Sequence, residues 1–232
     1  MAKSPIEFLA YEETPLGPIC LRRRELLSQP GVIVTEVTLN HEFLMSSLYT
    51  ESEKTLTRMA IEMHGGDQLQ VMIAGLGLGY TAFEALESNH VDRVEVIELL
   101  PQVIGWMNDG LTPLSRMLSD DPRLAVTQAD AYSVLASSPE KNFDLILIDI
   151  DHSPDDRLGT GDSFTFYSRQ GLSTAKKHLR PGGLLGVWSY AESSSFADAL
   201  RSKFKTVRVV PITHQNELIH EEHTDWLFFA FD

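Results

Sequence analysis

Short apolar runs alternate with helix-patterned segments over most of this chain of 232 residues. The runs "QVMIAG" (70–75), "RVEVIEL" (93–99) and "FDLILIDI" (143–150) are long enough for a strand, and segments such as "YTAFEALESN" (80–89) separate them. A helix between two strands acts as a crossover, which makes the strands parallel and buries the sheet on both faces. The alternation therefore predicts a doubly wound, Rossmann-like α/β fold.

Seven strands are expected in this sheet, and the last two differ from the rest. "TVRVVPI" (206–212) and "DWLFFAFD" (225–232) have no convincing helix between them, so we expect an antiparallel last strand in a mostly parallel sheet. This arrangement is typical of class I S-adenosylmethionine-dependent transferases. Residues 213–225 contain His214, His220 and His223, which we interpret as a solvated hairpin loop and not as a metal site.

A small β segment precedes this domain, and we place the boundary between residues 1–49 and residues 50–232. "PICLRRREL" (18–26) and "GVIVTEVTL" (31–39) predict two strands around a Pro-Gly turn. The three arginines at 22–24 are interpreted as a solvated sheet edge, with a site for an anion as the alternative. Thr50 and Glu53 form the pattern of a capping box, which predicts a helix over residues 50–63.

Charge and composition limit the partners of this chain. The formal net charge of −14 argues against a nucleic-acid partner and fits a small cationic substrate better. Cys20 is the single cysteine, so no internal disulfide can form, and this suits a reducing compartment. We find neither an apolar run long enough to span a membrane nor a secretory signal, and we expect a cytoplasmic protein without a membrane partner.

Glycines and acids follow the strands at the positions where a nucleoside would bind. Gly75, Gly77 and Gly79 form a G-x-G-x-G turn between the first strand and its helix. Glu98 ends the next strand, where a carboxylate can accept both ribose hydroxyls, and Asp130 ends the third. Dinucleotide-binding proteins carry G-x-G-x-x-G instead, so the pattern predicts an adenosyl group without a pyrophosphate.

Four aspartates and a histidine crowd the end of the fourth strand, in "DIDHSPDD" (149–156). Like charges at this spacing repel one another, which suggests a site for a cation. Asp149 and Asp151 are the stronger candidates, whereas Asp155 and Asp156 are interpreted as belonging to a solvated loop. His152 is either a base or a histidine hydrogen-bonded to its acidic neighbours.

Together the segments "VMIAGLGLGYTAFEAL", "VEVIELLPQVIGWM", "DPRLAVTQADAYSVL", "FDLILIDID" and "LRPGGLLGVWS" resemble the spermidine synthase (polyamine aminopropyltransferase) family, over about residues 50–204. The resemblance implies decarboxylated S-adenosylmethionine as cofactor, methylthioadenosine as product and a small amine as acceptor. It implies cofactor contacts at Gly75, Leu76, Gly77, Gly79, Glu98, Leu99, Asp130, Ala131 and Asp149. We further expect catalytic roles for Asp149, Asp151 and His152, and acceptor binding by Asp151, Asp155 and Tyr167, with no metal.

Three positions depart from the family pattern. Leu78 stands where the family's glycine loop carries an aspartate that binds the cofactor's amine. The segment after Asp149 has a different sequence from the family's catalytic segment. The Tyr-His-Glu with which the family binds the diamine has no clear counterpart. Two alternatives therefore remain: a methyltransferase that uses S-adenosylmethionine and releases adenosylhomocysteine, and a non-catalytic nucleoside-binding module. The sequence also leaves open whether the protein is a homodimer.

Overall fold

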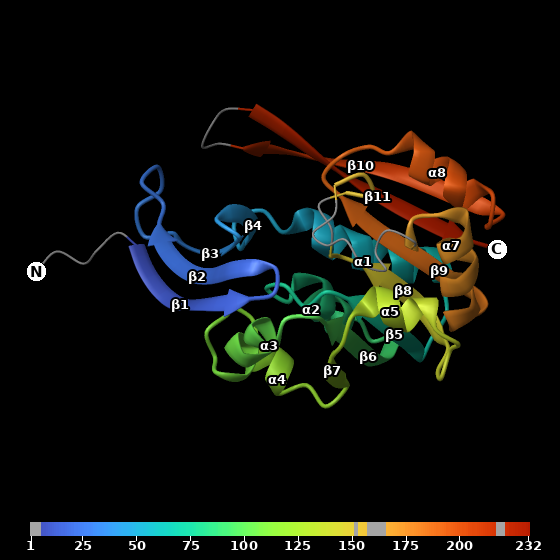
Figure 1. The fold of residues 1–232 in the computed structure, drawn as a ribbon, viewed down its shortest axis with the longest axis horizontal. Coiled ribbons are helices and arrows are strands. Elements are labelled where there is room, and N and C mark those ends of the chain that lie inside the picture. The colour runs from blue at the N-terminus through green and yellow to red at the C-terminus, as the bar shows by residue number, and fades with distance from the viewer. Residues whose placement is uncertain (1–5, 151–152, 157–165, 217–220) are drawn as a thin grey trace, which may run out of the picture.

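The computed structural model describes residues 6–150, 153–156, 166–216 and 221–232. In these ranges the chain forms two β-sheets, one of four strands at the N-terminus and one of seven strands flanked by helices (Figure 1). The larger sheet confirms the predicted doubly wound α/β fold. Its strands are β5 (Leu69–Ala74), β6 (Val91–Glu98), β7 (Leu124–Gln128), β8 (Phe143–Ile148), β9 (Leu179–Ser189), β10 (Thr206–Asn216) and β11 (Glu221–Phe231).

The strand order of the larger sheet is β10-β11-β9-β8-β5-β6-β7. All neighbours from β9 to β7 are parallel, and β11 is antiparallel to both β9 and β10. β10 is thus the edge strand of the sheet, and β11 lies between β10 and β9. This confirms the antiparallel last strand.

Helices cover both faces of the larger sheet because its central strands are apolar on both sides. In β8, Leu145 and Leu147 pack in one core cluster, and Ile146 and Ile148 pack in the other. On the first face lie α1 (Glu51–His64), α2 (Tyr80–Glu87), α3 (Pro101–Asn108) and α4 (Ser115–Ser119); on the second lie α5 (Ala131–Ala136), α7 (Arg169–Ala175) and α8 (Ser194–Arg201). No helix within the described ranges has the length and apolar character needed to cross a membrane.

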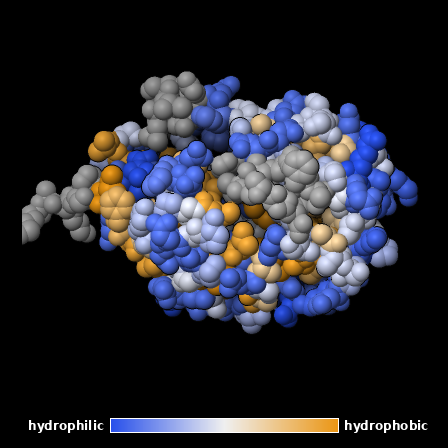
Figure 2. All heavy atoms as spheres, in the orientation of Figure 1, coloured by the Kyte–Doolittle hydropathy of each residue, from blue (hydrophilic) through white to orange (hydrophobic). Residues whose placement is uncertain are grey.

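The N-terminal sheet is larger than the sequence predicts. It contains the strands β1 (Ile6–Thr14), β2 (Gly17–Glu25), β3 (Ile33–Leu39) and β4 (Glu42–Ser46), in that order and all antiparallel. The pattern identified only β2 and β3, since β1 and β4 are edge strands whose apolar side chains stay largely exposed. Phe8 is 66% exposed and Phe43 58%, and apolar side chains are prominent at this end of the molecule in Figure 2.

The arginines of β2 do not form a solvated edge, because β2 lies inside the sheet between β1 and β3. Arg22 and Arg24 point to the same side, and both pair with the buried carboxylate of Glu36 on β3, at 2.9 and 2.6 Å. Arg23 points the other way and donates to the carbonyl of Leu111. The interpretation as an edge is therefore wrong: strand pairing gives two of these arginines a carboxylate partner that lies 12 to 14 residues further along the chain.

Two local expectations also differ from the structure. Helix α1 begins as predicted, but Thr50 makes no side-chain capping bond. The sequence "FTFYSRQGLSTAKKHL" (164–179) has the apolar spacing of one long helix, but it is described only from Phe166 onward, and there α7 spans Arg169–Ala175 with Ser168 as its cap. Tyr167, which we expected inside this helix, lies in the turn before that cap.

Candidate functional site

A cavity of about 720 Å³ lies at the carboxyl ends of the parallel strands, the edge at which open α/β sheets bind ligands. Loops after β5, β6, β7 and β8 form one side of its wall, and the N-terminal sheet and α1 form the other. Its size is that of a site for a small organic ligand. Backbone and side chains from both parts of the chain line the cavity, among them Met45, Tyr49, Ser52, Glu53, Gly75, Leu76, Gly77, Leu78, Gly79, Glu98, Leu99, Leu100, Asp130, Ala131, Tyr132, Asp149, Trp188, His214, His223 and Asp225.

The glycine loop after β5 forms part of this wall with its backbone. All three glycines have positive φ, and Gly75 in addition lies against the end of β8. A Cβ atom on Gly75 would be 2.2 Å from the carbonyl oxygen of Asp149, which is too close for any side chain. A Cβ on Gly77 would meet the sulfur of Met45 at 3.3 Å. The glycines therefore allow the loop to lie between β8 and the N-terminal sheet.

Glu98, at the end of β6, is 8% exposed and lines the cavity beside this loop. Its two carboxylate oxygens accept hydrogen bonds from the backbone N–H groups of Leu76 and Leu100, each at 2.8 Å. Burial raises the pKa of Glu98, while the backbone donors act in the opposite direction. Backbone N–H groups of Leu99 and Gly77 also act on this carboxylate, so it is held in one orientation at the edge of the cavity.

Asp130 and Ala131 line the cavity at the start of α5, and Leu99 also lines it. The side chain of Asp130 is the N-cap of α5, since it accepts from the N–H of Tyr132 at 3.0 Å and from the hydroxyl of Ser133 at 2.8 Å. These bonds hold the carboxylate in one orientation. Asp130 thus has a structural role whether or not it contacts a ligand.

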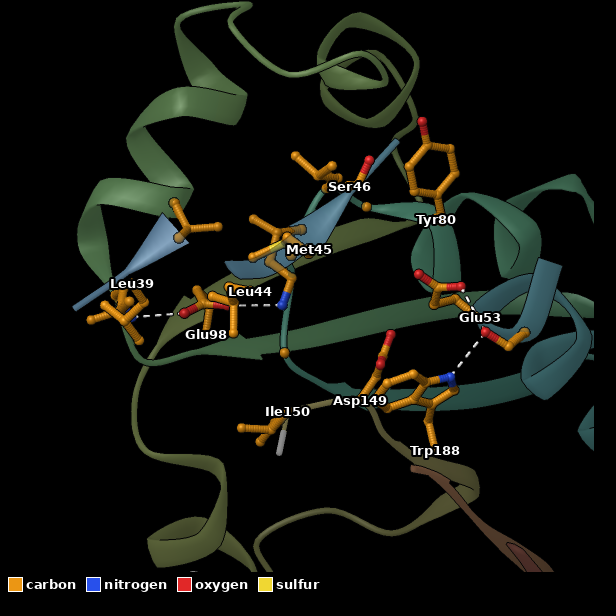
Figure 3. Close-up of a pocket in the computed structure, with 18 of the residues that line it drawn as sticks. Leu39, Leu44, Met45, Ser46, Glu53, Tyr80, Glu98, Asp149, Ile150 and Trp188 are labelled. Carbon is orange, nitrogen blue, oxygen red and sulfur yellow. Dashed lines mark hydrogen bonds between the residues drawn. The ribbon is translucent and has the colours of Figure 1, made fainter. Parts of the chain in front are cut away.

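At the other end of the cavity, three carboxyl groups come together from three distant parts of the chain. Asp149 follows β8, Glu53 lies in the first turn of α1, and Asp225 lies on β11. Figure 3 shows Glu53 and Asp149 on the same side of the cavity, with Glu98 at the opposite end. A concentration of carboxyl groups on one wall favours a cationic ligand.

Burial raises the pKa values of all three acids, and neighbouring carboxylates add to the rise for Glu53 and Asp149. Burial, together with the charges of Asp149 and Asp225, raises the pKa of Glu53 to about 8. Burial likewise raises the pKa of Asp149 to about 6, and a hydrogen bond of 2.5 Å from the Thr81 hydroxyl opposes this rise. The pKa of Asp225 is also raised by burial, and the nearby His214 and His223 lower it. At neutral pH the cluster therefore carries fewer charges than its three carboxyl groups would suggest.

A chain of hydrogen bonds holds Glu53 in place. The indole N–H of Trp188 donates to the Ser52 hydroxyl at 3.0 Å, and this hydroxyl donates to Glu53 at 3.1 Å (Figure 3). Because an indole can only donate, the Ser52 hydroxyl accepts from Trp188 and keeps its own proton for the neighbouring carboxyl groups of Glu53 and Asp225. The position of Glu53 is thus set by β9 as well as by its own helix.

The β10–β11 hairpin extends beyond the rest of the sheet and adds aromatic rings to the cavity wall. β11 pairs with β9 only from Trp226 onward, whereas β10 and β11 remain paired out to Asn216 and Glu221. Here His214 stacks on Tyr49 at 4.7 Å and on His223 at 6.0 Å. The interpretation of residues 213–225 as a loop is therefore wrong for the described positions. His220 lies outside the described residues.

Several residues expected at the site lie elsewhere. Asp151 and His152 lie outside the described residues. Asp155 is exposed in the turn formed by residues 153–156 and does not line the cavity. Tyr167 is buried in the core, where its hydroxyl lies 2.9 Å from that of Tyr132, and only Tyr132 lines the cavity.

Sequence reasoning missed Glu53, Asp225, His214 and His223 as candidates. Glu53 matched a capping pattern, and the other three fell in a segment rich in polar residues. No sequence signal marked Glu53, because its proximity to Asp149 exists only after α1 has packed on the sheet. Among the described residues, no group of three or more metal-ligating side chains is placed to hold an ion.

No protein-family model matches the chain, but it is similar to curated relatives and to solved structures. A polyamine aminopropyltransferase of Aeropyrum pernix is 29% identical over 131 residues, which are 56% of this chain and 40% of the relative. Polyamine aminopropyltransferase 2 of Pseudomonas aeruginosa is 29% identical over 168 residues, 69% of this chain and 46% of the relative. The matched parts therefore span less than half the length of these two relatives.

Solved structures show the same fold at lower identity. A spermidine synthase in complex with the transition-state analogue AdoDATO superimposes with a TM-score of 0.76 at 18% identity, covering 97% of this chain and 73% of that one. Spermidine synthase from Thermotoga maritima gives a TM-score of 0.74 at 16% identity, covering 97% and 72%. These matches include the N-terminal sheet as well as the α/β domain.

Proposed function

We propose that this chain, which is related in sequence and fold to the spermidine synthase (polyamine aminopropyltransferase) family, transfers an aminopropyl group from an adenosyl-sulfonium compound to an amine. One observation carries the proposal: a single cavity has a glycine loop and Glu98 at one end and the carboxyl groups of Glu53, Asp149 and Asp225 at the other. The first end suits a nucleoside, and the second suits an amine.

The residues at the first end fit the adenosyl part of the donor. The glycine loop leaves no side chain between its backbone and the cavity at Gly75, and backbone hydrogen bonds hold the Glu98 carboxylate beside it. Asp130 and Ala131 would border the adenine, as the resemblance implies. When bound, the sulfonium compound supplies a carbon that is already attached to a good leaving group, so the protein chiefly has to position the amine.

The residues at the second end fit the amine. A free alkylammonium has a pKa near 10, so the amine must lose a proton before it can attack. Asp149 is proposed to accept this proton, and its raised pKa of about 6 makes it a better base than an ordinary aspartate near neutral pH. Glu53 and Asp225 are proposed to attract the cationic parts of the amine.

The same acids select the donor. Ordinary S-adenosylmethionine carries an α-carboxylate, which the ionised carboxyl groups of Asp149 and Asp225 would repel, whereas the decarboxylated compound carries only the amine. Leu78 supplies no carboxylate from the glycine loop, so this amine would have to be held from α1 and β11 instead. Decarboxylated S-adenosylmethionine is therefore the proposed donor and methylthioadenosine the proposed product.

A methyltransferase is the second candidate, and the apolar Leu78 favours it. This side chain is 4% exposed and lines the cavity where the family's loop carries an aspartate. The products separate the two candidates, because methyl transfer from S-adenosylmethionine releases adenosylhomocysteine.

The experiment is to incubate the protein with either donor and a series of amines, and to identify the nucleoside product by chromatography. The proposal expects methylthioadenosine from the decarboxylated donor, weaker donor binding by Glu98→Gln, and binding without turnover in Asp149→Asn. Asp155→Asn is the matched control, since this exposed carboxylate lies outside the cavity and its loss should change neither quantity. Release of adenosylhomocysteine alone would favour the methyltransferase, and calorimetry without binding of either donor would refute both.

A further inference from the structure

Thr81 lies in the first turn of α2, is 3% exposed, and contacts the side chain of Asp149 with its hydroxyl. Its hydroxyl oxygen is 2.5 Å from Oδ2 of Asp149. A hydroxyl has a single proton to donate, and an ionised carboxylate can only accept, so the bond runs from Thr81 to Asp149. Such charge-assisted bonds are short and stronger than neutral ones.

We propose that Thr81 is a positioning residue: its hydroxyl fixes the Asp149 carboxylate against α2 and favours the ionised form of this carboxyl group. The bond uses Oδ2 and leaves Oδ1 for the cavity that Asp149 lines. The link to catalysis rests on the proposed function, in which Asp149 receives the proton of the amine. The hydrogen bond between Thr81 and Asp149 does not depend on the proposed function.

Both partners of this bond are held by the backbone around them. The carbonyl of Thr81 accepts a hydrogen bond of 3.0 Å from Thr57 on α1. The N–H of Asp149 donates to Ala74 at 2.9 Å, and its carbonyl lies so close to Gly75 that no Cβ would fit between them. The hydroxyl and the carboxylate therefore meet at a fixed distance before any ligand arrives.

The groups that face Asp149 affect how readily its carboxyl group ionises, as the Thr81 bond does. Glu53 approaches from α1 and Asp225 from β11, and the cation-forming His214 and His223 act on Asp225. Neighbouring acids repel one another when ionised, so a local hydrogen-bond donor favours ionisation of the acid that it contacts. Asp149 has the Thr81 hydroxyl, and its pKa of about 6 lies below the value of about 8 for Glu53.

The test is Thr81→Val, which removes the hydroxyl and keeps the shape of the side chain. Protein labelled with ¹³C at the aspartate carboxyl groups is titrated by NMR, and the Asp149 signal is assigned by its loss in Asp149→Asn. We expect the pKa of Asp149 to rise by about one pH unit or more, because a hydrogen bond to a charged group is lost. Thr81→Ser should restore the wild-type titration, which a purely structural effect of the substitution would not do.

Thr112→Val is the matched control. Thr112 is another buried threonine, and its hydroxyl contacts Ser115 and no carboxylate; its loss should leave the Asp149 titration unchanged. If Thr81→Val does not fold, Thr81→Ala is titrated instead. An unchanged pKa of Asp149 in the folded variant, or no rescue by serine, would overturn the inference.

Activity separates this inference from the proposed function. With a working donor and amine, the acidic limb of the rate profile should move to higher pH in Thr81→Val by the same amount as the Asp149 titration. Donor affinity should remain within about twofold, since Thr81 does not line the cavity. If the NMR shift occurs but no donor and amine react, the positioning stands and the proposed function fails.

Discussion

Glu53 should make the free protein less stable as the pH rises, and Glu53→Gln should remove this dependence. Its pKa is raised from 4.5 to about 8 in the folded protein. Between these values the folded state keeps a proton that the unfolded state has already lost. Stability therefore falls as the pH rises through this window. Glutamine carries no charge in either state and lacks the effect.

The size of the effect follows from the window. One group that keeps its proton contributes a slope of about 1.4 kcal/mol per pH unit. From about pH 5 to pH 8 this sums to roughly 4 kcal/mol, and because water enters the cavity we expect about half, ~2 kcal/mol. For a chain of this length, ~2 kcal/mol corresponds to a change of about 4–8 °C in Tm.

The assay is thermal unfolding, followed by circular dichroism, of wild type and Glu53→Gln across this range at constant ionic strength. The two proteins should have nearly equal Tm values at about pH 5, and the variant should unfold at a higher temperature at about pH 8. Glu62→Gln, an exposed glutamate of the same helix, is the control and should follow the wild type at every pH.

The result that would refute the reasoning is a difference that does not change with pH. A constant offset would mean that glutamine alters packing or hydrogen bonding, and that the carboxyl group of Glu53 titrates normally. A diamine provides a second check within the same assay. A bound cation favours the ionised form, so the dependence of wild type on pH should become weaker in its presence.

Three further predictions concern the loop, the N-terminal sheet and the hairpin. Gly75→Ala should lower stability by about 3 kcal/mol or more and abolish donor binding, because its Cβ would lie 2.2 Å from the Asp149 carbonyl at a φ of +95°; thermal unfolding and calorimetry measure these effects. Glu36→Gln should cost about 2 kcal/mol in denaturant unfolding, since its two arginine partners are only about 30% exposed and lose their carboxylate. His214→Ala should raise the KM for the amine while donor affinity stays constant, because the ring lines the cavity and stacks on Tyr49; an equal loss for donor and amine would contradict this placement.

The local pattern was informative where a position is buried whatever its partners are. Each strand of the larger sheet was visible as an apolar run, because a central parallel strand such as β8 is covered on both faces. The edge strands β1 and β4 were not visible, since they have only one neighbouring strand and large exposed apolar residues such as Phe8. A strand that is buried on one side alone has a weaker apolar pattern in its sequence.

The residues of the site also fall into those that the local sequence indicates and those that only tertiary packing brings together. The sequence alone determined the α/β fold, the glycine loop, and the acids Glu98, Asp130 and Asp149 that end three of the strands, because these features depend on a strand and the turn that follows it. Only the tertiary structure decided that Glu53 and Asp225 join Asp149 and that Thr81 holds it. Thr81 and Asp149 are 68 positions apart in the sequence, and Glu53 and Asp225 are 172 positions apart. These groups approach one another only when the helices and the hairpin pack on the sheet, so no local sequence pattern indicates that they are close.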